Sequence, residues 1–140
     1  SVGISQIVFS PLAQGVLTGK YRAGEQPPAG SRATDEKGGA DMIKRWMSDD
    51  VLERVQQLAP IAEEAGLSMA QLAVAWTLQN NNVASAIIGA SRPEQVQDNA
   101  AASGIKLDDE LLAKIDDVLD PMIERDSART RESSPKTREA

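Results

Sequence analysis

The chain has 140 residues, with 15 Lys and Arg against 21 Asp and Glu, a formal net charge of −6, and neither Cys nor His. Without these two residue types the chain itself cannot hold a Ser-His-Asp or Cys-His nucleophilic site, a Cys- or His-ligated metal or a disulfide. The acidic balance argues against nonspecific binding to nucleic acid or to an anionic membrane, because both need a cationic surface.

No apolar run approaches the roughly 18 to 20 residues that cross a bilayer, and no basic-then-apolar signal sequence opens the chain. The sequence therefore predicts a soluble, cytoplasmic protein without membrane insertion. The chain begins at Ser1 almost directly in an apolar run, so we expect a piece of a longer polypeptide. A true short gene product is the alternative.

The first predicted element is a strand over residues 4–9, which are β-branched and uncharged until Ser10 and Pro11 stop them. Its uniform apolar character is typical of a strand buried on both faces. From Ser10 to about Asp49 the chain is rich in Gly, Pro, Ser and charge, which predicts a long loop with a short helical turn near residues 42–47. Loops of this length in a compact domain are usually functional or disordered.

Two helices follow. Apolar residues at helical spacing predict the first over residues 51–65, kinked or divided at Pro60 and ended by Gly66 in a left-handed conformation. Ser68 and Gln71 have the form of a capping box, which predicts that a second helix begins there and runs to about residue 80.

A second buried strand is predicted over residues 83–90, which carry no charge. Ser91 with Glu94 then predicts a helix N-terminus, with Ser91 as N-cap, and the helix runs to Gly104. A last amphipathic helix is predicted over residues 109–119. Beyond Pro121 the chain has little apolar character and is expected to be a mobile tail.

Strands that alternate with helices predict a parallel α/β architecture. Two strands alone would leave both edges of the sheet and much of its surface open. The rest of the sheet is therefore expected from another segment. In a (β/α)₈ barrel the site lies at the carboxyl ends of the strands, with a phosphate pocket after the seventh and eighth, and two late strands that feed polar loops fit this plan.

Both predicted strands lead into loops with features of a binding site. The first loop carries Gly15, Gly19 and Lys20, which differ from a phosphate-binding P-loop in spacing and in the residue that follows the Lys, so the glycines could serve only as turns. The second leads into a helix N-terminus, whose free N–H groups and dipole suit a phosphate, with Arg92 beside it. An ordinary capped surface helix is the alternative.

Three segments together resemble the C-terminal part of an aldo-keto reductase, in the branch of the potassium-channel beta subunits and bacterial aldehyde reductases. They are Phe-Ser-Pro-Leu-Ala-Gln-Gly-Val-Leu-Thr-Gly-Lys-Tyr at residues 9–21, Ala-Gln-Leu-Ala-Val-Ala-Trp at residues 70–76, and Ile-Ile-Gly-Ala-Ser-Arg-Pro-Glu-Gln at residues 87–95. The resemblance implies a (β/α)₈ TIM barrel of which this chain holds strands seven and eight, their helices and the extra C-terminal helix. Residues 1–120 would belong to that single barrel domain and residues 121–140 to a polar tail.

The resemblance also implies an NADP(H) site, with the nicotinamide stacked on an aromatic ring, a first loop along the pyrophosphate closed by two loop cations, and a second loop at the adenosine end and its 2′-phosphate. In chain order these residues are Phe9, Ser10, Pro11, Leu12, Gln14, Lys20, Arg32, Gly89, Ala90, Ser91, Gln95, Asp98 and Asn99. Phe9 could instead be a plain core residue. Many relatives carry Glu at the position of Asp98. The residue at position 92 varies in type among them, so the role of Arg92 stays a hypothesis.

The family's catalytic Asp, Tyr, Lys and His would lie on earlier strands, so we assign no catalytic residue and no metal ligand to this chain. Tyr21 matches a different motif and is not taken as the proton donor. The acidic pairs, among them Asp49-Asp50 and Asp116-Asp117, are interpreted as solvated surface charge.

Three functions remain open on this evidence: an NADP-dependent reductase of aldehydes or ketones, an NADP-binding regulatory subunit with little turnover, and a non-catalytic piece that acts as an interaction module. The expected partners are a small carbonyl substrate and the missing N-terminal barrel segment, and no nucleic acid. Self-association into a homo-oligomer is left open.

Overall fold

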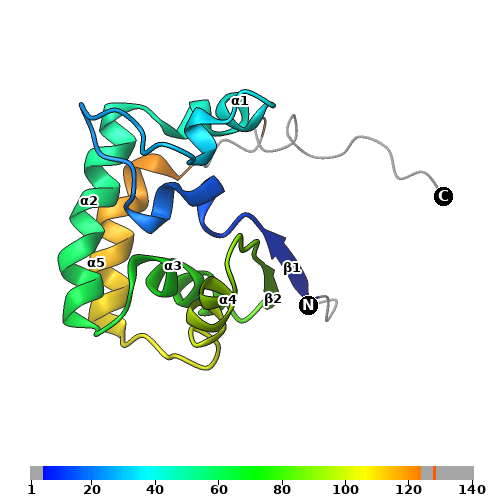
Figure 1. The fold of residues 1–140 in the computed structure, drawn as a ribbon. Coiled ribbons are helices and arrows are strands. Elements are labelled where there is room, and N and C mark those ends of the chain that lie inside the picture. The colour runs from blue at the N-terminus through cyan, green and yellow to red at the C-terminus, as the bar shows by residue number, and fades with distance from the viewer. Residues whose placement is uncertain (1–4, 124–127, 129–140) are drawn as a thin grey trace.

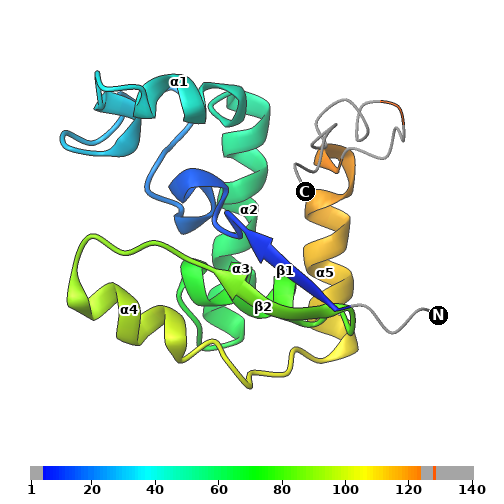
Figure 2. The ribbon, with the colours of Figure 1, turned by 90° about the vertical axis from the view of Figure 1, so that its right-hand side faces the viewer.

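A computed structural model describes residues 5–123 and residue 128 of the chain, without the side chains of Phe9 and Arg45. The strands and α-helices are β1 (Gln6–Phe9), α1 (Gly39–Ile43), α2 (Asp49–Glu64), α3 (Met69–Leu78), β2 (Val83–Ile87), α4 (Pro93–Ala100) and α5 (Asp109–Leu119). Four 3₁₀ turns, η1 (Ala13–Thr18), η2 (Arg32–Thr34), η3 (Lys44–Trp46) and η4 (Asp120–Met122), complete the elements. The helices gather on one side of the strand pair (Figures 1 and 2).

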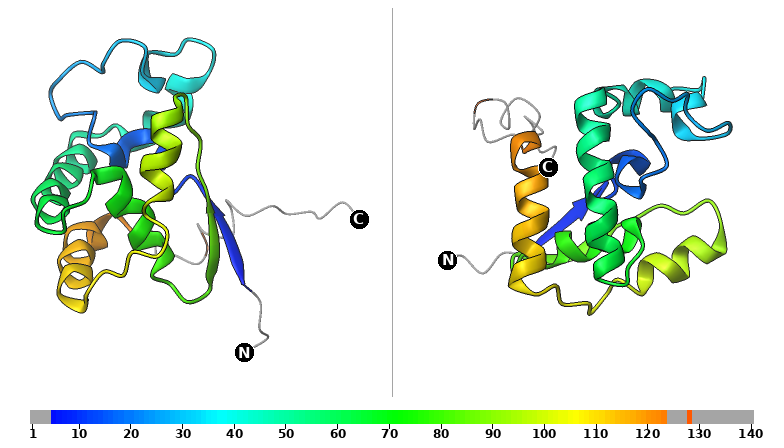
Figure 3. Two further views of the ribbon diagram at one scale, coloured as in Figure 1. Left: turned by 60° about the horizontal axis from the view of Figure 1, so that its bottom comes forward. Right: turned by 90° about the vertical axis from the view of Figure 1, so that its left-hand side faces the viewer.

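The two strands pair in parallel, with Val8 opposite Ala86 and Phe9 opposite Ile87. Because partners in a parallel ladder share a face, Val8 and Ala86 lie on one side, where both are half-buried and α3 packs against β2. The other face carries Ile7, 67% exposed, and Ile87, 59% exposed. The left view of Figure 3 shows the pair nearly edge-on, with the helices on one side.

The prediction of two strands buried on both faces is therefore wrong for this chain. Their apolar composition is that of buried strands, but the described residues cover only one face of a two-stranded sheet. The outer edges of both strands are also unpaired within residues 5–123.

The main core lies among α2, α3 and α5; in Figure 1, α2 and α5 run side by side and α3 lies across from them at a different orientation. Leu58 of α2, Leu72 of α3 and Ile115 of α5 are at most 4% exposed and belong to one apolar cluster. A second cluster joins the long loop to α2, with Tyr21 and Ile43 packed against Val55. The loop is thus folded onto the helices rather than free, because it buries its own apolar side chains there.

Local signals placed most helices correctly. The Ser68 hydroxyl oxygen accepts a hydrogen bond from the Gln71 backbone N–H, and the Gln71 side-chain oxygen accepts one from the Ser68 backbone N–H, which is the predicted capping box of α3. Gly66 has a φ of +67°, as expected after α2. However, α2 continues through Pro60 as one helix. Pro60 is exposed, so water can bond the backbone carbonyl that its missing N–H leaves without a partner.

The predicted start of α4 is wrong by one residue. Its N-cap is Arg92 and not Ser91, because Pro93 occupies the first helical position, where its missing N–H costs nothing. The N3 residue is accordingly Gln95 and not Glu94, and α4 ends at Ala100, before Gly104. Among the described helices none combines the length and the apolar character of a membrane span.

Candidate functional site

The loops that follow β1 and β2 leave the sheet side by side. The strands are parallel and their last residues, Phe9 and Ile87, are register partners. The loops that begin at Ser10 and Ile88 therefore start from the same edge, as Figure 2 shows. The structure thus brings together the two segments that the sequence singled out.

The first loop has an unusual backbone. Ser10, Ala13 and Gln14 have φ values of +54°, +47° and +60°, and they are the non-glycine residues with positive φ in the part of the chain described. Such a conformation costs about 1–2 kcal/mol for each L-residue. It is supported by bonds from the Ala13 N–H to the Ser10 carbonyl at 2.9 Å and from Gln14 Nε2 to Ser10 Oγ at 3.0 Å. Strain of this kind concentrates at ligand sites.

Of the residues predicted in this loop, Ser10 is exposed, while Pro11, Leu12 and Gln14 are half-buried. The backbone of Phe9 ends β1, but its side chain lies outside the described residues, so its stacking role remains a prediction. The hydrogen bond from Gln14 Nε2 to Ser10 Oγ holds these two side chains next to each other at the carboxyl end of β1.

The two cations predicted to close over the loop are both exposed. Lys20 Nζ lies 5.3 Å from the centroid of the Tyr21 ring. Arg32 begins η2, farther along the same long loop. Because the chain carries a net charge of −6, a bound phosphate group would need local positive charge, and these two exposed cations could supply it.

The second loop presents Gly89, Ala90 and Ser91, all exposed, before α4. The side-chain oxygen Oε1 of Gln95 accepts hydrogen bonds from the Ser91 N–H at 2.8 Å, the Ser91 hydroxyl at 3.1 Å and the Arg92 N–H at 3.2 Å. One amide oxygen thus accepts from two backbone N–H groups beside the N-terminus of α4, where an anion could also bind.

Asp98 and Asn99 face α3 and the interior. The Asp98 carboxylate accepts hydrogen bonds from the Ser68 hydroxyl at 3.2 Å and from Gln71 Nε2 at 3.0 Å, so it joins α4 to the capping box of α3. Asn99 is 5% exposed. These hydrogen bonds give Asp98 a structural role, and the contact of either residue with an adenosine stays a prediction.

The sequence did not indicate that Ser68 and Gln71 hold Asp98, nor that Tyr21 is buried at 1% exposure. The capping box was visible as a local pattern, but its contact with a residue of α4 is tertiary. For Tyr21, the sequence carried no local signal of burial.

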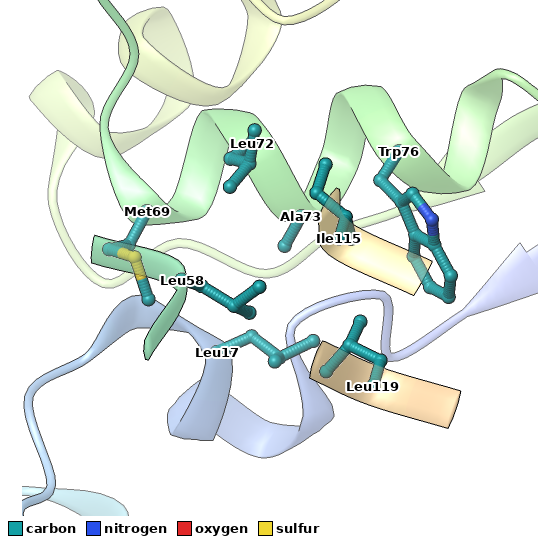
Figure 4. Close-up of a pocket in the computed structure, with 8 residues that line it drawn as sticks. All are labelled: Leu17, Leu58, Met69, Leu72, Ala73, Trp76, Ile115 and Leu119. Carbon is teal, nitrogen blue, oxygen red and sulfur yellow. The ribbon is translucent and has the colours of Figure 1, made fainter. Parts of the chain in front are cut away.

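The acidic pairs and a small apolar cavity lie elsewhere in the described part of the chain. The acidic pairs at residues 49–50, 63–64, 108–109 and 116–117 are exposed, as interpreted from the sequence, and no group of acidic side chains among the described residues is arranged to hold a metal ion. The cavity in Figure 4 is apolar and has a volume of about 10 Å³. Leu17, Leu58 and Trp76 are among its lining residues, so it is a small packing defect in the core.

An open groove of about 600 Å³ lies between α2 and η4, where Trp46, Asp50, Arg54 and Met122 contribute to its walls. None of the residues predicted for the NADP(H) site is among those that line it. The groove is therefore separate from the candidate site.

The comparisons with known proteins agree with the motifs. Among curated relatives, a "Probable voltage-gated potassium channel subunit beta" of Arabidopsis thaliana is 46% identical over 100 residues, which cover 71% of this chain and 30% of the relative. A "Putative voltage-gated potassium channel subunit beta" of Schizosaccharomyces pombe is 42% identical over 120 residues, which cover 84% of this chain and 34% of the relative. A "Probable voltage-gated potassium channel subunit beta" of Oryza sativa subsp. japonica is 43% identical over 119 residues, which cover 84% of this chain and 36% of the relative.

The chain thus spans about one third of the length of these relatives. The family model described as "Aldo/keto reductase family" matches residues 1–120. This chain belongs to the aldo/keto reductase family.

Proposed function

We propose that the intact protein is an NADP(H)-dependent oxidoreductase that reduces aldehydes or ketones, and that this chain supplies much of its cofactor-binding face. The observation that carries the proposal is the parallel pairing of β1 and β2, which puts the loops after Phe9 and Ile87 at one edge. In α/β proteins a ligand binds at the carboxyl ends of parallel strands, where such loops meet.

The open side of the sheet supports a second part of the proposal, that an N-terminal segment completes a (β/α)₈ barrel. Ile7 and Ile87 are large apolar residues exposed on the face that no described helix covers. A barrel would bury that face against the side chains of its other strands and would pair both open edges. The family's catalytic Asp, Tyr, Lys and His would belong to that segment.

The residues present fit a dinucleotide. When bound, NADPH supplies the hydride for a carbonyl carbon. Ser10 and Gln14 would line its pyrophosphate through hydroxyl and amide groups, and Lys20 and Arg32 would neutralise phosphate charge. The N-terminus of α4 would donate its N–H groups at the adenosine end, with Gln95 moving aside or sharing them.

A second candidate is an NADP-binding regulatory subunit with little turnover. The names of the three relatives, each a potassium channel subunit beta, favour it. Both candidates need the same cofactor face, so they differ in turnover and not in the residues proposed here.

The test is a titration of the intact protein with NADPH and NADH, followed by the fluorescence of Trp46 and Trp76 and of the bound nicotinamide. Saturable binding with a preference for NADPH is expected, and consumption of NADPH with an aldehyde then identifies a reductase. Tight binding with negligible consumption across carbonyl substrates would select the regulatory subunit. Absence of saturable binding of either nucleotide would overturn the proposal.

A further inference from the structure

Tyr21 is buried and contacts the segments that carry the two loop cations, Lys20 and Arg32. Lys20 and Arg22 on either side are exposed, whereas Tyr21 is 1% exposed. Its ring packs in the cluster that includes Ile43 and Val55. A buried tyrosine is held in one orientation, so it can hold in place whatever contacts its ring and hydroxyl.

The backbone of Tyr21 is attached to a helix. Its carbonyl accepts a hydrogen bond from Gln56 Nε2 of α2 at 3.2 Å. Because α2 is a 16-residue helix in the main core, Tyr21 gives this part of the long loop a rigid reference point.

The ring of Tyr21 contacts the first cation. Lys20 Nζ lies 5.3 Å from the ring centroid, within the range of a cation–π interaction. Lys20 also passes Gly15, where an added Cβ atom would lie 3.1 Å from Lys20 Cε and Nζ. The ammonium group therefore lies close both to the Tyr21 ring and to the backbone of the strained loop after β1.

The hydroxyl of Tyr21 reaches the segment that carries the second cation. Its oxygen accepts a hydrogen bond from the Ala33 N–H at 3.4 Å, a long bond that joins the start of η2 to the ring. Ala33 follows Arg32 directly. Arg32 Cγ lies 3.1 Å from the position that a Cβ of the buried Gly39 would take. The backbone beside Arg32 is thus joined to the Tyr21 hydroxyl through Ala33, and the stem of the exposed Arg32 side chain passes close to Gly39.

We propose that Tyr21 is a positioning residue for both loop cations, acting on Lys20 through its ring and on Arg32 through its hydroxyl. This rests on the proposed function, in which the two cations meet the phosphate groups of a dinucleotide. Since separate parts of one side chain hold the two cations, substitutions can separate the two effects.

The experiment compares Tyr21→Phe with Tyr21→Leu in the intact protein. Tyr21→Phe keeps the ring and removes the acceptor of the Ala33 N–H, so amide hydrogen exchange at Ala33 is expected to speed up. The preference for NADPH over NADH is expected to fall roughly threefold to tenfold, the range of one hydrogen bond. Tyr21→Leu also removes the cation–π contact and is expected to weaken binding of both nucleotides.

A double-mutant cycle separates positioning from general destabilisation. Arg32→Ala is expected to change the nucleotide preference less in the Tyr21→Phe background than in the unchanged protein, because the two substitutions remove one effect. Val55→Ala, in the same cluster, is the matched control: it should lower stability and leave the preference unchanged. An unchanged preference in Tyr21→Phe, or full additivity with Arg32→Ala, would overturn the role of Tyr21 while NADPH binding stands. Failure of the unchanged protein to bind NADPH would instead overturn the proposed function and this role with it.

Discussion

The side-chain oxygen of Gln95 accepts a hydrogen bond from the Ser91 backbone N–H at 2.8 Å, so a side chain of α4 itself satisfies a backbone donor just before the helix. The same oxygen accepts from the Arg92 N–H at 3.2 Å. A phosphate group at this terminus would compete with Gln95 for the same donors. The Gln95 side chain therefore stabilises α4 but would weaken the binding of an anion at the same place.

Gln95→Ala is expected to lower the free energy of unfolding by about 1 kcal/mol, the typical effect of losing a helix cap. Chemical denaturation followed by circular dichroism measures it. Gln97→Ala, an exposed position on the same helix, is the control and should change stability by less than half as much. Equal losses at the two positions would show that the cap is unimportant.

Gln95→Glu separates the two roles of this side chain. A carboxylate keeps an acceptor for the Ser91 and Arg92 N–H groups and suits the positive end of the helix dipole, so stability should be kept or rise slightly. Its negative charge would repel a phosphate at the same place, so the Kd for NADPH should increase several-fold. Unchanged NADPH affinity in this variant would mean that no phosphate group lies beside α4.

Arg32→Ala is expected to weaken NADPH binding more than NADH binding, if the guanidinium contacts the 2′-phosphate. A hydrogen bond to a charged group is worth about 1.5–3 kcal/mol, which corresponds to roughly tenfold or more in Kd. The two dissociation constants are measured by nucleotide fluorescence, with Arg22→Ala as the control, since Arg22 is an exposed arginine of the same loop. Equal losses for both nucleotides would exclude the 2′-phosphate contact.

Phe9→Ala is expected to weaken binding of both nucleotides and to leave the intact protein folded, if the ring stacks on the nicotinamide. The reason is that stacking is lost whether or not the 2′-phosphate is present. Nucleotide titration and thermal unfolding are measured on the same samples. A large drop in thermal stability with unchanged affinity would make Phe9 a core residue.

Lys114 lies between two carboxylates, with its Nζ 2.9 Å from Glu64 Oε1 and 3.2 Å from Glu110 Oε1. Hydrogen bonds to Glu64 and then to Glu110 raise the pKa of Lys114 above its usual value of 10.5. A pKa that is higher in the folded state stabilises the protein below pH 10.5, and this contribution is lost as the pH rises through the folded pKa.

The prediction for Lys114 is that its side-chain NMR signals titrate above pH 10.5 and that Glu64→Gln lowers the titration midpoint. Glu64 is the larger cause of the shift, so Glu110→Gln should lower the midpoint less. The reverse order would contradict the assignment of Glu64 as the main partner.

The sequence predicts elements whose signals are local. The capping box at Ser68 and the left-handed Gly66 are decided by the residues within one helical turn, so α3 and the end of α2 were correctly placed. At α4 two N-cap positions compete: Ser91 with Glu94 three residues later, and Arg92 with Gln95 three residues later. Pro93 selects the second, because its ring suits the first helical position.

What depends on contacts between distant segments was not predictable. The apolar pattern of β1 indicates burial, but whether Ile7 is covered depends on neighbours outside the described residues. In the candidate site, the motif residues near Ser10 and Ser91 could be proposed from the sequence because each motif is contiguous. The contacts of Tyr21 with Ala33 and Gln56, and of Asp98 with Ser68, join separate elements and carry no periodic signal.

The pairing of β1 with β2 also orders the events by which the chain folds. The strands are adjacent in space, yet α1, α2 and α3 lie between them in sequence. Closing such a long loop costs more conformational entropy than forming a helical turn, and non-local strand pairing is slow for that reason. We expect the helices to form and pack early and the β1–β2 ladder to form late, so the two motif loops acquire their shared edge only at the end of folding.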